Sequence, residues 1–235
     1  TKTNDIEPVS KGVDFFAHVD NVDTKTSIDG LKVLWAKKDS IAIQVTKNHL
    51  DNASRPREYA TTLGIYKLAD DAAGTNVGRF TYSSGAEQIT GDEEFFAFYP
   101  ASYCTANKGN GYFYVDFPMT QYYEDNIGDK LPLPMYGIGS NRNVDFKYAG
   151  AVIKLRVWSK EKTSIHSCVI SADNLSKRAF TFVKDGKWHQ KLWNAYSVNN
   201  LNMNMRKPLE ISNVESDPTV ITMIVPLADT TILTN

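Results

Sequence analysis

The four histidines are the first residues to consider for metal binding or acid–base chemistry. They are His18, His49, His166 and His189. No two of them have the His-x-His or His-x-x-x-His spacing that brings two imidazoles onto one metal ion. The two cysteines, Cys104 and Cys168, also lack a metal-ligand spacing, and they fit either one disulfide or two free thiols. We therefore predict no metal site and no cofactor.

Carboxylates and serines are the next candidates, because they could supply a hydrolase site. Asp92, Glu93 and Glu94 could line a sugar-cleaving cleft, although a solvated turn before an apolar strand explains the cluster more simply. Ser84 and Ser140 each stand beside a glycine, but neither lies in a Gly-x-Ser-x-Gly nucleophile elbow. No nucleophile–base pair can be named from the sequence, so we expect a protein that is not an enzyme.

Two groups of aromatic residues could bind carbohydrate, because flat apolar rings stack on sugar rings. They are Tyr122 and Tyr123 in a long connection, and Trp188 and Trp193 in an expected strand. Aromatic residues that alternate in strands are more often core residues, and adjacent tyrosines more often pack a loop against the protein. Carbohydrate binding is therefore kept as the alternative function, behind a structural role.

Composition and charge exclude several classes of partner. The 235 residues are 42% hydrophobic and 23% charged, which is an ordinary globular profile with enough chain to bury a core. The formal net charge is −1 and the pI is near 6.4, so no overall field favours nucleic acid or an anionic membrane. No apolar run approaches the roughly 18 residues of a membrane span.

The longest regular pattern covers residues 144–158 and alternates apolar with polar side chains. Apolar residues take even positions before Gly150 and odd positions after it, as Val144 and Ile153 illustrate. A period of two is typical of a half-buried strand, and one extra residue at the glycine would form a bulge. We predict a central strand of a β-sandwich here, with neighbours paired along both of its edges.

Shorter alternating runs predict further strands, and no window carries a helical apolar stripe. The main runs are 12–19, 40–45, 59–68, 79–83, 94–99, 112–117, 166–171, 179–183, 188–193 and 219–225. Short strands separated by turn residues predict an all-β sandwich. We expect a leader over 1–11, one β-sandwich domain over 12–195, and a junction with a closing strand, or the first strand of a second β domain, over 196–235.

The run Thr219–Val225 is the most apolar segment of the chain. Its alternate residues Ile221, Met223 and Val225 could fill pockets in a neighbouring molecule if the strand were added to an open sheet edge. They could equally line the core of the chain's own sandwich. The sequence leaves these two interpretations open.

The order of several motifs resembles that of the Bacteroidetes fimbrillin-like proteins. The motifs are Phe15-Phe16-Ala17, Thr24-Lys25-Thr26, Trp35-x-x-x-Asp39-x-Ile41, Phe96-Ala97-Phe98-Tyr99-Pro100, Leu133-Pro134-Met135-Tyr136, Val144-x-Phe146-Lys147-Tyr148-x-x-Ala151-x-x-Lys154-Leu155 and Ile224-Val225-Pro226. The sequence departs from the family at Lys38-Asp39, where Gly-Asp is usual, at Phe98-Tyr99-Pro100, where Tyr-Tyr-Pro is usual, and at Tyr148, where His is common. The family's lipoprotein cysteine has no counterpart near Thr1, as expected after removal of a leader.

The resemblance implies a transthyretin-like β-sandwich that is exported to the outer membrane as a lipoprotein. Membrane contact is then expected only through a lipid anchor that is not present in this sequence. It also implies a cell-surface role in adhesion, as a fimbrial (pilus) subunit, tip or anchor that assembles with other subunits by strand exchange. Host or bacterial surface proteins or glycans are further expected partners. The leaving strand would carry Val13, Phe15, Ala17 and Val19. The donor would normally lie in a second sandwich, so giving that role to Ile221, Met223 and Val225 is our own extension.

Overall fold

A computed structural model describes residues 14–19, 34–45, 63–85, 94–106, 113–127, 131–184, 187–192, 196–226 and 231–233. Within these ranges the regular structure is β-strand, apart from three single-turn 3-10 helices: η1 (Asp70–Ala72), η2 (Ala101–Tyr103) and η3 (Tyr123–Asp125). The predicted all-β class is therefore confirmed, and several sheets pack face to face as in a sandwich. No helix of the described part is long and apolar enough to cross a bilayer.

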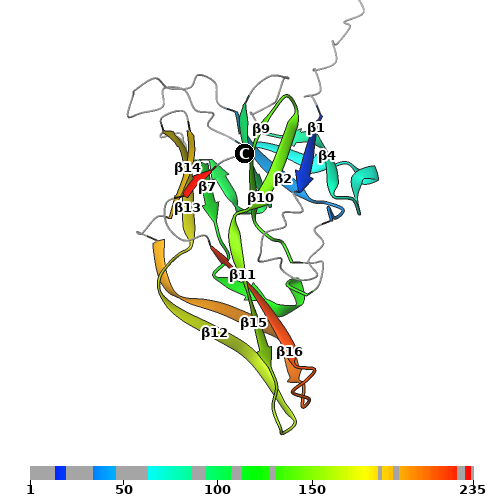
Figure 1. The fold of residues 1–235 in the computed structure, drawn as a ribbon, viewed down its shortest axis with the longest axis vertical. Coiled ribbons are helices and arrows are strands. Elements are labelled where there is room, and N and C mark those ends of the chain that lie inside the picture. Colours follow the sequence, from blue (N-terminus) through cyan, green and yellow to red (C-terminus); the bar gives the residue numbers. More distant parts are fainter. Residues whose placement is uncertain are drawn as a thin grey trace, which may run out of the picture.

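The upper half of the molecule contains a sheet that closes into a barrel (Figure 1). Its strands are β1 (Phe15–Val19), β2 (Ser40–Val45), β3 (Gly64–Leu68), β4 (Val77–Ser84), β5 (Phe95–Tyr99), β9 (Met135–Ser140) and β10 (Asn143–Tyr148), in the order β1-β10-β9-β5-β2-β3-β4. The first strand, β1, pairs parallel with β10 and antiparallel with β4, so this short strand completes the barrel.

The barrel interior is filled by the inward residues of these strands around one tryptophan. Trp35 is almost fully buried, and its ring meets Phe80, Tyr99 and Phe146 edge-on at centroid distances of 5.0, 5.5 and 5.7 Å. Edge-to-face packing is a favoured geometry for aromatic rings. Ile41 belongs to the same cluster, so the tryptophan motif of the sequence marks the centre of a core.

A second sheet covers one outer face of the barrel. It consists of β6 (Cys104–Ala106), β7 (Phe113–Asp116), β13 (Arg178–Lys184), β14 (Lys187–Leu192) and β17 (Thr231–Leu233), in the order β17-β14-β13-β7-β6. Phe96 and Phe98 point from β5 into the layer between barrel and sheet, where they meet Val115 and Ala179. Phe95 points into the barrel, so β5 is apolar on both faces, as a doubly covered strand must be.

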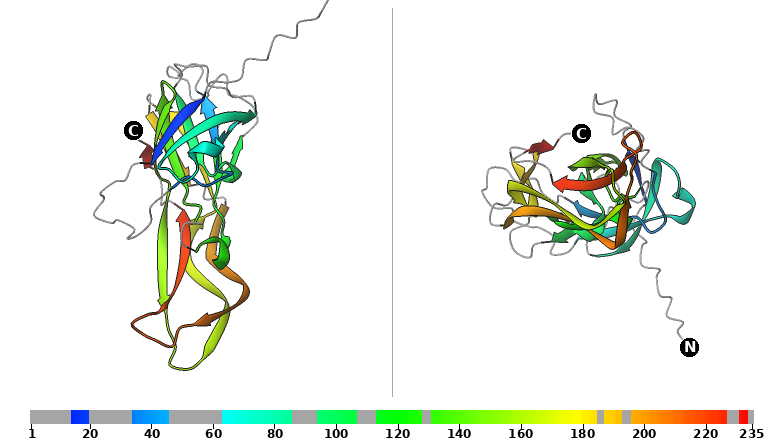
Figure 2. Two further views of the ribbon diagram at one scale, coloured as in Figure 1. Left: turned by 90° about the vertical axis from the view of Figure 1, so that its right-hand side faces the viewer. Right: turned by 90° about the horizontal axis from the view of Figure 1, so that it is seen from below.

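The lower half extends along the long axis, away from the barrel (Figure 2). It contains β8 (Thr120–Tyr122), β11 (Gly150–Val157), β12 (Thr163–Ser176), β15 (Ser197–Ile211) and β16 (Thr219–Pro226). These strands form the pair β11-β16 and the sheet β12-β15-β8, which share one apolar cluster. The expected boundary at residues 195 and 196 falls between β14 and β15 and does not coincide with the division between the halves.

The prediction of one continuous strand over residues 144–158 is wrong. The segment forms two strands in different sheets, since β10 belongs to the barrel and β11 to the lower half, where it pairs with β16 alone among the described strands. The chain turns at Ala149, whose N–H donates to the Pro134 carbonyl. A Cβ on Gly150 would lie 2.7 Å from the Val225 carbonyl oxygen. The change of phase at Gly150 therefore marks the passage between the two halves.

A carboxylate anchors the turn between Trp35 and β2. Asp39 accepts hydrogen bonds from the Ala36 N–H at 2.7 Å and from the Tyr99 hydroxyl at 3.0 Å. Burial raises the pKa of Asp39 above its ordinary value of 3.8, although the two hydrogen bonds oppose the shift. A raised carboxyl pKa gives stability that is present below the unfolded-state pKa and is lost as pH rises through the folded-state pKa. The two hydrogen-bond donors therefore offset part of the cost of burying Asp39 in its ionised form.

We expect Tyr99→Phe to destabilise the protein by about 1.5 kcal/mol near neutral pH, because it removes one donor from a half-buried carboxylate. The loss should shrink as pH falls through the raised pKa of Asp39, since a protonated carboxyl needs the donor less. Urea unfolding at neutral and acidic pH measures both effects. Tyr148→Phe, at an exposed ring, is the control. An equal loss at the two pH values would contradict the assignment.

Candidate functional site

The five described strands of the lower half form a ring around one apolar cluster, with an opening on one side. Pairing gives the order β12-β15-β8 on one side and β16-β11 on the other. Two buried amide side chains, Gln121 of β8 and Asn126 after η3, join β8 to β16. No strand ladder joins β11 to β12 among the described residues, although these strands follow each other in the chain. The opening therefore lies between β11 and β12.

Gln121 replaces a paired strand at the edge of β16. Its side-chain NH₂ donates to the Ile224 carbonyl at 2.7 Å, and its side-chain oxygen accepts from the Ile224 N–H at 2.9 Å. Asn126 donates to the same Gln121 oxygen at 2.8 Å and to the Thr222 carbonyl at 2.9 Å. Backbone polar groups that are buried must find partners. These two amides supply them, so this part of the β16 edge is closed to another strand.

The same bonds fix the direction of the backbone groups in β11. Ile224 lies opposite Val152 in the β11–β16 ladder, and both of its backbone groups point away from β11. In an antiparallel ladder both members of such a pair point outward. The N–H and C=O of Val152 and of Arg156, four residues on, therefore point to the edge of β11 that faces away from β16. None of the described strands pairs with that edge.

The apolar face of the ring is less buried toward the opening. On the sealed side Met203, Ile221 and Met223 are completely buried. On the open side the side chains that pack on this cluster are only half-buried, and they come from β11 and β12. They are Leu155, Val157, Ile165, Cys168 and Ile170. The opening therefore combines an unpaired strand edge with a partly exposed apolar face.

The chemistry of this opening is that of strand pairing. Burial raises the pKa of the Cys168 thiol, which makes it a poor nucleophile near neutral pH. Within the described ranges no three His, Cys, Asp or Glu side chains gather in a way that could hold a metal ion. Backbone donors and acceptors with apolar side chains between them are what an incoming strand recognises.

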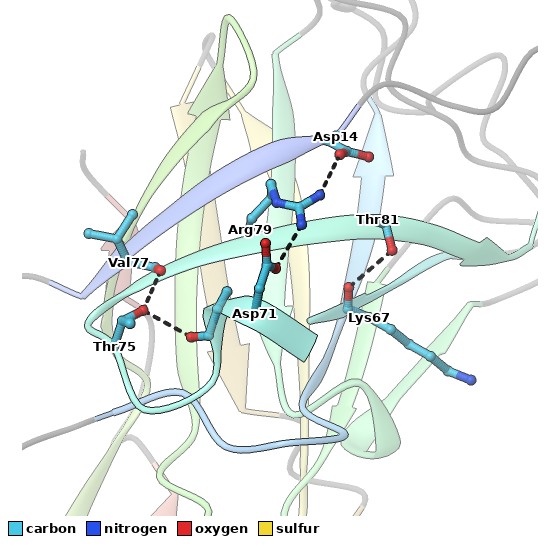
Figure 3. A network of polar contacts seen from close by, with 8 residues as sticks. Asp14, Lys67, Asp71, Thr75, Val77, Arg79 and Thr81 are labelled. Atoms are coloured by element: carbon cyan, nitrogen blue, oxygen red, sulfur yellow. Dashed lines mark hydrogen bonds and ion pairs between the residues drawn. The ribbon is translucent and has the colours of Figure 1, made fainter. Parts of the chain in front are cut away.

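The first strand of the barrel is a second place where strand exchange could act. Arg79 of β4 holds the start of β1, because its guanidinium contacts Asp14 at 3.1 Å and Asp71 of η1 at 2.7 Å (Figure 3). Both hydrogen-bonded carboxylates raise the pKa of Arg79, Asp71 more than Asp14. Ala17 of β1 is fully buried in the barrel. Loss of β1 would therefore expose the edges of β4 and β10.

We expect Arg79→Ala to speed amide hydrogen exchange in β1 severalfold while exchange in β5 stays unchanged. The arginine is partly exposed, so its ion pairs are weak and screened by salt, and only the strand they hold should respond. Hydrogen exchange with mass spectrometry at low and high salt measures this. Lys67→Ala, at an exposed position of β3, is the control. Unchanged exchange in β1 at low salt would show that these ion pairs do not hold the strand.

The other predicted exchange residues fall in several settings. Val13 lies outside the described residues, and for Phe15 and Val19 only the backbone in β1 is described. Ile221 and Met223 are core residues of the chain's own lower half, and β16 pairs with β11 along eight residues. Val225 is half-buried in the same cluster. The structure therefore places the apolar run as an internal strand, and its use as a donor stays a prediction.

The predicted carbohydrate residues do not form one described surface. Tyr122 is exposed, and one face of its ring lies against the Arg206 guanidinium, 4.5 Å from the ring centre. Tyr123 packs against the core of the lower half. Trp188 lies in β14 with only its backbone described, and Trp193 lies outside the described residues. Carbohydrate binding stays a prediction, which a glycan array with the wild type and Tyr122→Ala would test.

Sequence reasoning missed the residues that decide which edge is open. Gln121 and Asn126 lie in a segment for which the sequence predicts a long connection with one strand near 112–117. Nothing in their local sequence distinguishes a buried amide from an exposed one. Their role arises from contacts about a hundred residues away, with Thr222 and Ile224. The cysteine alternatives are also decided, since Cys104 and Cys168 are both free thiols.

Comparison with known proteins adds little to this description. No family model matches the sequence, and no curated protein matches it. One solved structure that resembles the chain is that of a protein from Bacteroides ovatus described as a "putative cell adhesion protein". The likeness has a TM-score of 0.46 at 15% identity, and it covers 92% of this chain and 78% of the other. Similarity of this degree carries no argument about function, and membership of the fimbrillin-like family stays a prediction.

Proposed function

We propose that this protein is a non-enzymatic structural subunit of the cell surface that associates with other subunits by strand addition. A fimbrial subunit or an adhesin-type protein fits this description. The observation that carries the proposal is the opening between β11 and β12, where an unpaired edge borders a half-buried apolar face. A single added strand would pair with β11 on one side and β12 on the other, and it would complete the ring.

Natural sheets normally protect their edges, because an exposed edge invites pairing with another chain. This protein protects one edge of the β11-β16 pair with Gln121 and Asn126 and leaves the other edge unpaired by any described strand. Because the edge of β16 is protected and the edge of β11 is not, we interpret the opening as a binding site and not as a region where the fold is poorly packed. The same chemistry requires no acid, base or metal.

The test uses a peptide of about nine residues that alternates valine with threonine, which is long enough to span an edge strand. We expect the peptide to slow hydrogen exchange in β11 and in β12, because it would hydrogen-bond to both edges. Exchange in β5, which is central in the barrel, should not change. Absence of protection at saturating peptide would contradict strand addition at this site.

A proline variant shows whether the backbone edge is responsible. Arg156→Pro removes an N–H that points away from β16, so the β11–β16 ladder keeps its own bonds. We expect this variant to bind the peptide at least about tenfold more weakly, whereas Arg156→Ala keeps the donor and should bind like the wild type. Equal binding by both variants would show that the edge of β11 is not the contact.

A further inference from the structure

We propose that the strand received between β11 and β12 comes from another polypeptide and carries acidic side chains between its apolar ones. This inference rests on the proposed function and specifies the chemistry of the partner. It follows from the charged residues that border the opening and from the way in which the side chains of β11 alternate between the apolar cluster and the solvent.

The hairpin that joins β11 to β12 is basic. Arg156, Lys160 and Lys162 are exposed, and Glu161 is the one carboxylate between Gly150 and Thr163. The carboxylates Glu215 and Asp217 belong to the hairpin that leads into β16, which pairs with the opposite edge of β11. The positive groups therefore border the open edge, whereas these two carboxylates come from the sealed side.

The alternation of β11 brings these charges beside the incoming strand. Leu155 and Val157 face the apolar cluster, so Arg156 between them faces solvent. An added strand obeys the same alternation, with its apolar residues over the cluster and its other residues beside Arg156. Side chains on one face of neighbouring strands lie within contact distance, where opposite charges attract and like charges repel. Acidic residues in the outward positions therefore fit this edge, and basic ones do not.

The other border of the opening, β12, carries no lysine or arginine. Along its middle, the exposed residues of β12 include Ser167, Val169 and Ser171, none of which is charged. Its one carboxylate, the exposed Asp173, lies at the end of β12 away from the hairpin that carries Lys160 and Lys162. The preference for acidic residues should therefore arise at β11 and at the hairpin end. Because β11 and β12 are joined by a hairpin and run in opposite directions, the added strand is antiparallel to one of them and parallel to the other.

Three peptides with identical valines test the proposal. They carry glutamate, threonine or lysine at every intervening position, and their Kd values are measured with the full chain by fluorescence anisotropy. We expect the glutamate peptide to bind at least about tenfold more tightly than the lysine peptide at low ionic strength, with a smaller ratio at high salt. The double variant Arg156→Glu and Lys160→Glu should invert the order, whereas Lys67→Glu, on the barrel, should not.

The outcomes separate this inference from the proposed function. Equal binding of the three peptides, each with protection of β11 from exchange, would overturn the acidic pattern and leave strand addition standing. Failure of all three to protect β11 would overturn both. Self-association of the protein alone that protects β11 would assign the edge to a second copy, and it would overturn the acidic partner while supporting strand addition. Preferential binding of the glutamate peptide, inverted by the double variant, supports the proposal.

Discussion

Gln121→Leu is expected to reduce the free energy of unfolding by about 4 kcal/mol, although leucine has nearly the same size as glutamine. The change removes every bond that closes the Ile224 edge, and it leaves the Ile224 N–H and C=O buried without partners. Asn126 loses an acceptor as well. Each buried polar group without a partner costs about 1–3 kcal/mol. Urea unfolding followed by intrinsic fluorescence measures the loss.

The control for this prediction is Asn199→Leu, at an exposed position of β15, which should change stability by less than about 0.5 kcal/mol. Gln121→Leu should also make β16 accessible, so that the valine–threonine peptide protects β16 as well as β11. A loss below about 1 kcal/mol would mean that water can replace the glutamine, and the edge of β16 would then not be sealed.

Ala17→Asp should destabilise the barrel by about 4 kcal/mol, because it places an unpaired carboxylate in an apolar interior. Ala17 is completely buried inside the barrel, whereas its neighbour Phe16 is 41% exposed on the outside of the barrel. Phe16→Asp is therefore a matched control on the same strand, and it should cost less than about 1 kcal/mol. Thermal and urea unfolding measure both variants.

The pair of variants also tests how β1 is held. We expect Ala17→Asp to accelerate hydrogen exchange in β1, β4 and β10, because these strands meet at the seam that β1 completes. The lower half should keep the exchange of the wild type. Similar losses for Ala17→Asp and Phe16→Asp would contradict the assignment of Ala17 to the inside of the barrel.

Much of the fold could be predicted because local patterns reflect local burial. The sequence predicts strands around Ile41, Phe95 and Phe182, and each of these residues lies in a strand. The tryptophan motif marks the core at Trp35 for the same reason. The pairing of strands is different, because it depends on residues far apart in the chain. The alternation around Gly150 is the same whether one bulged strand continues or two strands enter different sheets.

The candidate site could be predicted less well than the fold. The sequence singles out the apolar run that contains Ile221 and Met223. Its alternation does not distinguish a strand in the chain's own core from a strand that is added to a neighbouring molecule. One edge of β11 is open because none of the described strands pairs with it. A local sequence pattern cannot predict which strands pair. Gln121 is a polar residue whose side chain pairs with the backbone at the edge of β16. From the sequence alone, a polar residue in a long connection indicates a loop.

The most direct measurement of the central claim is hydrogen exchange of the full chain with and without the glutamate–valine peptide. We predict that protection rises in β11 and in β12 together, while β16 and β5 stay unchanged, because a strand between β11 and β12 pairs with both edges. Protection of neither strand, or protection confined to the barrel seam at β4 and β10, would contradict it.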